Sequence, residues 1–433
     1  MAEIKALKAW RYHDRLIPKI ESLTSPLFDV VSNEQRQTLY QNAYNSIHLS
    51  VPAGDNPVQT AIQTLLQWKN ENVIVQDPVP GIYVYYQHFV LPGSKEFFCR
   101  KGFMCNIKAY DWDEDVVLRH ENTIPKAVDK RVELLKGLQL NASPTHGLYS
   151  DPQFLLESYM DDSMRNPILE TEDYQGVRDV MSVIQDPEII QEFVNTIESL
   201  QIILADGHHR YQGSINYRAA MTSSNPNHHG YEAYNYHLMY LTNLDAKDLR
   251  ILPTHRLIQD HQPFDAKQLI KKLEDYFLIK PIANPLDINE IILGKQWCFG
   301  LVLPEQTYEI RLKPEVFHLL DWPFPEEVNK LDLTVLHYFV LEKALGIPGP
   351  EQRMADQIIY DRNFTDCITK VDHGRAQMAL ITNELSMQEV KRVCFSGATL
   401  PQKSTYFYPK VICGFVFGSI KEDEFDQTPD PSF

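Results

Sequence analysis

The stretch SLQIILADGHHRYQGSINYRAAM, residues 199–221, predicts the central structural unit of this chain. Its apolar run 202–205 is typical of a buried strand. Beyond the polar turn Asp206–Arg210, residues with the four-residue spacing of one helix face follow: Tyr211, Ile215 and Ala219. The segment therefore predicts a strand, a tight turn and a helix.

The turn combines groups that suit phosphate binding. A helix N-terminus offers main-chain N–H groups and the positive end of the helix dipole. Gly207 would let the main chain approach a ligand closely, and Arg210 can hold an anion through two parallel hydrogen bonds. His208 and His209 can donate to phosphate oxygens and titrate near neutral pH. Asp206 could bind Mg²⁺ or orient an acceptor group.

Two other interpretations of this turn stay open. Asp206 could cap a purely structural helix, with both histidines exposed on the surface. A transition metal could instead bind the histidines. Neighbouring side chains on a helix diverge by about 100°, however, which disfavours His208 and His209 as ligands of one ion.

Composition limits the classes of function. The 433 residues are 43% hydrophobic and 23% charged, as in ordinary folded domains. Acidic residues outnumber basic ones by 58 to 41, and the formal charge of −17 makes nucleic acid an unlikely partner. The longest apolar stretches are shorter than the ~20 residues that cross a bilayer. We therefore expect a cytoplasmic protein without membrane contact, whose six dispersed cysteines are reduced.

Element signals occur along the whole chain. Apolar, β-branched or aromatic runs predict five strands, at 81–91, 115–121, 199–206, 297–303 and 409–418. Start signals predict helices after Ser32 and Ser386 and from Pro125. A further helix, over 332–346, should end at Gly346. We expect an N-terminal α/β part over 1–260, a second α/β part over 261–420 and a disordered acidic tail over 421–433.

The string ADGHHRY (205–211) resembles the signature of the domain of unknown function 1015 family. The likeness extends over about residues 20–418 and has four further segments, namely SPLFDV (25–30), RHENT (119–123), LPTHRL (252–257) and KSTYFYPK (403–410). Where the family has Pro-Pro-Tyr-Asp-Val, this chain has PLFDV. Asp29 is retained, but a tyrosine hydroxyl is lost.

The turn is also similar to those of the ParB/sulfiredoxin-like superfamily, whose members place it under nucleotide phosphates. Free serine kinases belong to this group and use an upstream glutamate as a base. The resemblance implies an α+β fold with a ParB/sulfiredoxin-like core elaborated by an additional mixed sheet and helices. It implies ATP or ADP with Mg²⁺ as cofactors, Asp206 as the metal ligand and Glu121 as the general base. Catalytic roles then extend to Asp206, His208 and His209.

We expect phosphotransfer between a nucleotide and a small hydroxyl metabolite, with free serine or phosphoserine as the best candidate. Candidate substrate-binding residues lie in three cationic segments, and these are Arg119, His255, Arg256, Lys403, Ser404 and Thr405. The alternative is a nucleotide-binding regulatory protein without kinase activity. The oligomeric state stays open.

Overall fold

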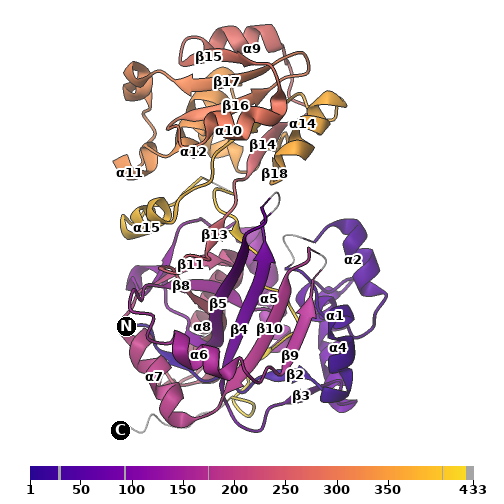
Figure 1. Ribbon diagram of the computed structural model, residues 1–433. Coiled ribbons are helices and arrows are strands. Elements are labelled where there is room, and N and C mark those ends of the chain that lie inside the picture. The colour runs from indigo at the N-terminus through magenta and orange to yellow at the C-terminus, as the bar shows by residue number, and fades with distance from the viewer. Residues whose placement is uncertain (28–30, 92–93, 174, 402, 426–433) are drawn as a thin grey trace. The chain divides into compact units, whose positions relative to one another are not determined.

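The computed structural model describes residues 1–27, 31–91, 94–173, 175–401 and 403–425. The chain forms two compact units (Figure 1). The first comprises Met1–Arg119, Thr123–Leu249 and Pro409–Phe433, and the second comprises His120–Asn122 and Arg250–Tyr408. Both units mix helices with sheets, so the α+β class is confirmed. Asp29 lies outside the described residues.

A nine-stranded mixed sheet organises the first unit, with the strand order β6-β11-β8-β12-β5-β4-β10-β9 and β1 added beside β5. Two pairs, β11 with β6 and β12 with β8, are parallel. The strands of this sheet are β1 (Ile4–Lys5), β4 (Ile82–Val90), β5 (Phe97–Lys108), β6 (Val117–Arg119), β8 (Thr145–Tyr149), β9 (Leu169–Glu172), β10 (Arg178–Ile184), β11 (Ile202–Asp206) and β12 (Tyr236–Asn243). Short strands pair separately, as β2 (Trp10–Tyr12) with β3 (Ile74–Gln76) and β7 (Leu140–Asn141) with β21 (Gly418–Ser419).

Both faces of this sheet are covered (Figure 1). Along β4, Tyr83 and Tyr85 enter one core cluster while Ile82 and Val84 enter the other, as the two-residue period of a strand requires. The first cluster includes residues of α1 (Ile20–Leu23), α4 (Pro57–Asn70) and the C-terminal segment 411–417. The second includes residues of α6 (Glu157–Ser163), α7 (Pro187–Glu198) and α8 (His208–Ser224).

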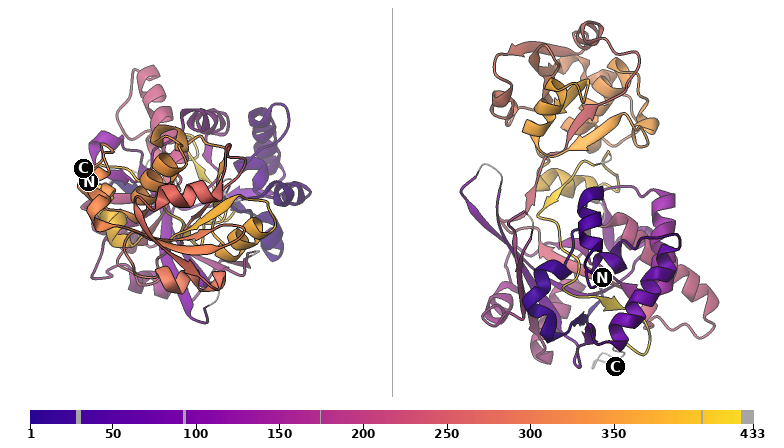
Figure 2. Two further views of the ribbon diagram at one scale, coloured as in Figure 1. Left: turned by 90° about the horizontal axis from the view of Figure 1, so that it is seen from above. Right: turned by 90° about the vertical axis from the view of Figure 1, so that its right-hand side faces the viewer.

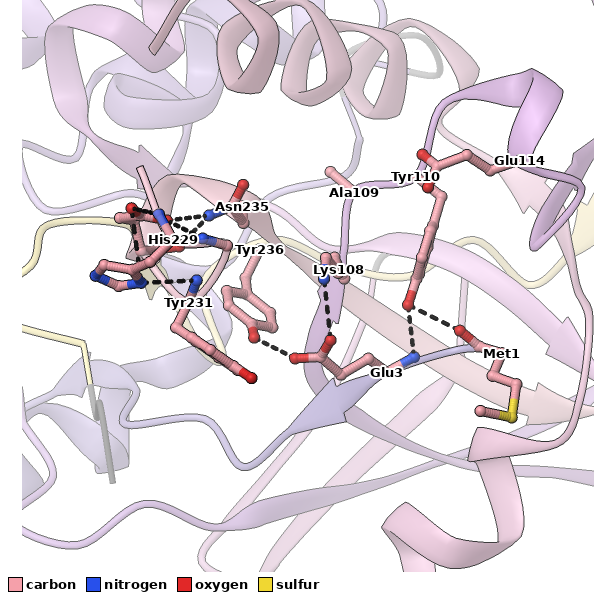
Figure 3. Close-up of polar contacts among 12 residues, drawn as sticks. Met1, Glu3, Lys108, Ala109, Tyr110, Glu114, His229, Tyr231, Asn235 and Tyr236 are labelled. Atoms are coloured by element: carbon pink, nitrogen blue, oxygen red, sulfur yellow. Dashed lines mark hydrogen bonds and ion pairs between the residues drawn. The ribbon is translucent and has the colours of Figure 1, made fainter. Parts of the chain in front are cut away.

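Hydrogen bonds hold the N-terminal residues beside the C-terminal end of β5 (Figure 3). The carboxylate of Glu3 accepts hydrogen bonds from the hydroxyl of Tyr236 and from Lys108 Nζ, the latter at 3.2 Å. The hydroxyl of Tyr110 accepts from the Glu3 N–H at 3.0 Å and donates to the Met1 carbonyl at 2.8 Å. These contacts hold β1 in register beside β5.

The second unit contains a six-stranded antiparallel sheet in the order β15-β17-β16-β19-β14-β18. Its strands are β14 (His255–Ile258), β15 (Phe277–Ile282), β16 (Cys298–Val302), β17 (Thr307–Leu312), β18 (Ile358–Asp361) and β19 (Met378–Ile381). Strand β13 (Arg250–Ile251) pairs with β20 (Phe407–Tyr408). The helices are α9 (Ala266–Leu273), α10 (Ile288–Ile292), α11 (Glu326–Asn329), α12 (Asp332–Val335), α13 (Gly349–Gln352), α14 (Phe364–Asp372) and α15 (Met387–Phe395).

The predicted helix starts are confirmed. Ser32 Oγ accepts from the Gln35 N–H at 3.1 Å at the start of α2 (Asn33–Tyr40). Pro125 is the first residue of α5 (Pro125–Leu138), and Ser386 forms a full capping box at α15. The helix predicted over 332–346 begins as α12 and continues as the π-helix η6 (Leu336–Ala344). The first unit also contains the short helix α3 (Ile47–Ser50).

Four predicted strands are present as β4, β6, β11 and β16, but the strand predicted over 409–418 is wrong. This segment makes only isolated bridges, between Cys413 and Ser25 and between Phe417 and Trp10, until Gly418 enters β21. Gly414 adopts a φ of 107°, which interrupts an extended strand. Side chains along 411–417 are buried without alternation, so the apolar run reflects a buried coil.

The C-terminal segment, yellow in Figure 2, lies among the indigo and purple elements of the first unit. Glu424 pairs with Lys69 at 2.6 Å and accepts from Trp10 Nε1 at 2.9 Å. The rest of the tail, residues 426–433, lies outside the described residues. All six cysteines are described, and none forms a disulfide. Across the described ranges, no helix is long and apolar enough to cross a membrane.

Replacement of Gly102 tests the packing of the central strands. A Cβ atom there would clash with the Leu241 carbonyl oxygen and lie 2.6 Å from Tyr240 Cε2. We expect Gly102→Ala to lower the free energy of unfolding by roughly 3 kcal/mol or more, because main chain must shift. Denaturant unfolding measures this loss. Gly176→Ala is the control, since its Cβ meets nothing and only its φ of 78° costs energy, about 1 kcal/mol. Equal losses would contradict the packing argument.

Candidate functional site

The strand, turn and helix predicted at 199–221 are present as β11 and α8, with Gly207 between them. Gly207 is the N-cap residue of α8 and has a φ of 93°. A Cβ atom on it would lie 2.6 Å from Thr145 Cγ2 and 2.9 Å from Arg210 Nη2. Glycine is therefore needed both for the left-handed conformation and for close packing against the chain itself.

A buried carboxylate between two cations forms the centre of the turn. Asp206 Oδ2 accepts from Arg210 Nη2 at 2.8 Å, and Asp206 Oδ1 pairs with Lys410 Nζ. Arg210 Nη1 also donates to Ser143 Oγ at 3.1 Å and to the carbonyl of Pro144. The three charged side chains are only 8–11% exposed. The trio carries a net charge of about +1 when all three groups are ionised.

Asp206 is ionised at neutral pH. Burial alone would favour its neutral form, but Lys410 and Arg210 outweigh burial and hold the pKa of this carboxyl well below its usual range. Both carboxylate oxygens are already bonded to cations, so Asp206 does not fit the predicted role of a Mg²⁺ ligand. Among the described residues, no group of three or more His, Cys, Asp or Glu could hold a metal ion.

If Asp206 only capped a structural helix, both histidines of the turn would be exposed on the surface, but neither of them is. His209 Nε2 accepts the N–H of Ile124 at 3.0 Å, and Ile124 is the N-cap residue of α5. This bond requires the proton of the neutral ring on Nδ1. His208 is buried, with 6% of its surface exposed. In this arrangement His209 positions α5, and its Nε2 is not directed at a phosphate.

Sequence reasoning missed a row of buried polar side chains that crosses the sheet from Asp206. Directly paired residues share a face, and Asp206 pairs with His146, while Gln87 pairs with both Arg100 and Asp179. Within the row, side-chain hydrogen bonds join His146 to Thr242, Arg100 to Gln87 and Gln87 to Asp179. Its members are Asp206, His146, Thr242, Arg100, Gln87 and Asp179.

The C-terminal segment closes over this row. The carbonyl of Pro409 accepts from Arg100 Nη2, and the carbonyl of Lys410 accepts from Gln87 Nε2 at 3.1 Å. The side chain of Lys410 reaches Asp206. Lys410 ends the string KSTYFYPK, so the family resemblance covered it. Polar residues within largely apolar strands were the only signal for Gln87 in β4 and Arg100 in β5.

The row contains groups with strongly shifted pKa values. Burial raises the pKa of Asp179 to about 7, although hydrogen bonds from Tyr85 and Gln87 favour its ionised form. Burial lowers the pKa of His146 well below its usual range, and Arg100 adds to this effect. Within the described part of the chain, Asp179 Oδ2 has no hydrogen-bond partner.

The second unit brings several other predicted residues together. His120 Nε2 and Thr405 Oγ1 are 2.8 Å apart, which places the 120–122 segment beside Lys403–Thr405. The Arg256 guanidinium lies 5.4 Å from the ring centre of Tyr360. Burial raises the pKa of Tyr360, and the charge of Glu121 adds to the rise while Arg256 opposes it. Glu121 and Arg256 therefore lie near one phenol.

Arg256 is fully buried and donates to His337 Nε2 at 3.2 Å and to the Thr254 carbonyl. Burial lowers the pKa of Arg256 to about 10 and that of His255 to about 4. Ser404 Oγ donates to the Pro401 carbonyl at 2.6 Å, whereas Lys403 is exposed.

Arg119 is the last residue of β6 in the first unit, where it pairs with Leu204 of β11. Its guanidinium lies 5.1 Å from the ring centre of Trp112. The turn Asp206–Arg210 belongs to the first unit and Glu121 to the second. A pocket that they share stays a prediction.

A family model with the description "Protein of unknown function (DUF1015)" matches residues 4–334. The chain belongs to this family. The resemblance predicted from ADGHHRY is thereby confirmed, while the ParB/sulfiredoxin-like core stays a prediction. A search among curated proteins finds no match.

Solved structures give remote similarities. A mutant free serine kinase in complex with AMP has 12% identity and a TM-score of 0.38, with 75% of this chain and 94% of that chain covered. A conserved hypothetical protein from Pyrococcus furiosus has 13% identity and a TM-score of 0.36, with coverage of 74% and 97%. SbnI with a C-terminal truncation, from Staphylococcus aureus, has 12% identity and a TM-score of 0.35, with coverage of 74% and 90%.

Asp206→Asn tests the carboxylate between the two cations. We expect the free energy of unfolding at pH 7 to fall by roughly 3–5 kcal/mol, because two buried cations lose their counter-charge. The pKa of Asp206 is depressed, so its stabilisation is fully present above the unfolded value near 4 and is lost only as pH falls below it. The loss should therefore be equal at pH 7 and pH 5.

Denaturant unfolding at both pH values measures the loss in Asp206→Asn. Asp162→Asn is the matched control, because its ion pair with Arg165 leaves the Asp162 side chain 68% exposed and should contribute less than about 1 kcal/mol. An Asp206→Asn variant as stable as the wild type would refute the argument.

Asp179→Asn tests the raised carboxyl pKa. Between pH ~4 and ~7 the native state holds a proton that the unfolded state has released, so the Asp179 contribution to stability falls as pH rises through this window. Relative to the wild type, we expect Asp179→Asn to gain roughly 1–3 kcal/mol between pH 5 and pH 8. Unfolding at several pH values measures this gain. The argument would be contradicted if the stability of Asp179→Asn relative to the wild type changed with pH as little as that of Asp162→Asn.

Proposed function

We propose that this protein binds a nucleotide with its phosphates at the N-terminus of α8 and transfers a phosphoryl group between that nucleotide and a small hydroxyl metabolite. Free serine, or phosphoserine in the reverse direction, is the first substrate to test, because the turn Asp206–Arg210 resembles those of free serine kinases.

The observation that carries the proposal is the excess of buried positive charge at a helix N-terminus. Arg210 and Lys410 are both bonded to the carboxylate of Asp206, and the N-cap residue Gly207 has no side chain to serve as a cap. The helix dipole adds to this positive potential. A phosphate group near these groups would gain charge-assisted hydrogen bonds where water is largely excluded.

Glu121 is the proposed general base. It follows Arg119 by two residues, so its Cα atom lies within about 7 Å of the end of β6. Arg119 pairs with Leu204, and Asp206 follows Leu204 by the same two residues. Parallel strands end at the same edge of a sheet, so the chain leaves β6 and β11 on the same side.

In the proposed step one bond to phosphorus forms, one breaks, and one proton is transferred. The hydroxyl oxygen forms a bond to the terminal phosphorus while the bond from that phosphorus to the nucleotide oxygen breaks. Glu121 accepts the hydroxyl proton, which requires hydrogen-bond contact or one bridging water. Positive charge from Arg210 and Lys410 would offset the charge on the phosphates. Asp206 has the role of holding these two cations, since its oxygens are bonded to them.

The purified protein incubated with serine, Mg²⁺ and either ATP or ADP should form phosphoserine, detected by mass spectrometry. Glu121→Gln should slow this reaction by about 10²–10⁴-fold, because the base is lost, and leave nucleotide affinity unchanged. Glu133→Gln, at an exposed position of α5, is the control and should retain full activity. Phosphoserine with AMP or ADP tests the reverse direction.

Two results would overturn the proposal. Nucleotide binding without transfer to a panel of small alcohols would exclude the kinase. Absence of any nucleotide binding would exclude the phosphate site at α8 as well.

A further inference from the structure

A small pocket in the first unit lies beside the first two turns of α8. Helices α5 and α8, the end of α3 and the segment after α5 form its walls. Its polar lining residues are Ser50, Arg131, Asn141, Ser143, Arg210 and Ser214. The remaining lining residues are leucines and an alanine, and none of the described lining residues is acidic.

Three of the lining residues each carry a buried polar atom with no hydrogen-bond partner within the described ranges. These atoms are Asn141 Nδ2, Ser50 Oγ and Arg210 Nε, on side chains from residues that are 7%, 5% and 9% exposed, respectively. Two of the three are N–H donors, and the hydroxyl can donate as well. Buried donors without an acceptor are unfavourable and rare, so a pocket whose lining residues carry three of them calls for a ligand rich in acceptors.

The charge of the pocket points in the same direction. Arg131 donates through Nη1 to the Ser50 carbonyl at 3.0 Å, which holds its guanidinium at the wall. The two terminal nitrogens of Arg210 already donate hydrogen bonds to Asp206, Ser143 and Pro144. Its Nε is therefore the nitrogen that remains to donate to a ligand. Ser214 Oγ contacts His237 Nδ1 at 2.7 Å, and burial lowers the pKa of His237 to about 3, so that ring is neutral.

We propose that this pocket binds a phosphate group, held by Arg131, Arg210 Nε, Asn141 Nδ2 and the hydroxyl of Ser50. Phosphate has enough acceptor oxygens for all of these donors, whereas a carboxylate has fewer. The site is not the turn at the start of α8, although Arg210 belongs to both. Asp206 fixes the guanidinium of Arg210 through Nη2 at 2.8 Å, and Nε is left without a partner among the described residues.

Isothermal titration of inorganic phosphate into the full chain tests the site. We expect one phosphate to bind, and Arg131→Met should weaken it by about 10- to 100-fold, because a charge-assisted hydrogen bond is lost. Asn141→Asp has almost the same shape and should abolish binding, because it places a carboxylate among the donors. Acetate should bind at least tenfold more weakly than phosphate.

Lys130→Met is the matched control. Lys130 precedes Arg131 on α5, is exposed and does not line the pocket, so its loss should leave phosphate affinity unchanged. Circular dichroism and thermal unfolding establish that each variant folds. If Arg131→Met does not fold, Asn141→Asp still decides the question. The proposal is overturned if the wild type binds no phosphate, if acetate binds equally well, or if both pocket variants bind phosphate like the wild type.

Titration of AMP and ADP in the presence of phosphate identifies the source of the group. Displacement of phosphate by a nucleotide would assign the pocket to a nucleotide phosphate, and independent binding would assign it to a free phosphate or another phosphorylated metabolite. Phosphate binding without phosphoryl transfer would leave this site intact and reject the proposed function. Phosphoryl transfer, together with phosphate binding that neither Arg131→Met nor Asn141→Asp changes, would support the proposed function and reject this site.

Discussion

The ionised carboxylate of Asp206 between Arg210 and Lys410 is the interaction on which the first unit depends. A buried charge is stable only when it is paired and hydrogen-bonded, and each member of this trio is unfavourable without the others. The trio joins the end of β11, the first turn of α8 and a C-terminal segment 204 residues away in the chain. It therefore fixes the helix N-terminus relative to the sheet and closes the fold.

The row of buried polar side chains that crosses the sheet from Asp206 depends on the C-terminal segment in the same way. Arg100 and Gln87 lie in the middle of long, largely buried strands, where their polar groups need partners that the ladder does not supply. The carbonyls of Pro409 and Lys410 supply one partner each, to Arg100 Nη2 and Gln87 Nε2, so the coil after β20 contributes directly to the polar row. Contacts of Pro409 and Lys410 with Arg100, Gln87 and Asp206 therefore tie the centre of the first unit to the last part of the chain.

The local unit at 199–221 could be predicted because its signals are local. An apolar run, a glycine and a four-residue spacing decide β11 and α8 without reference to the rest of the chain. Lys410 could not be predicted as the partner of Asp206, because periodicity carries no information about contacts across 204 residues. The strand predicted over 409–418 failed because a buried coil and a buried strand have the same apolar composition. Asp179 was overlooked since one carboxyl in a strand looks like an exposed residue until its neighbours are known.

The contrast between global and local charge limits what the site at α8 can bind. A charge of −17 repels polyanions over the whole surface, but salt screens that repulsion beyond about 8 Å. Inside the first unit, Arg210 and Lys410 act over shorter distances, and both are largely buried beside Asp206, where their charge is little screened by water. A small phosphate compound brings few negative charges to the protein, whereas a nucleic acid would have to bring many phosphates against an acidic surface. This difference in charge is the physical reason for proposing a single phosphate-bearing small molecule, and not a nucleic acid, as the ligand.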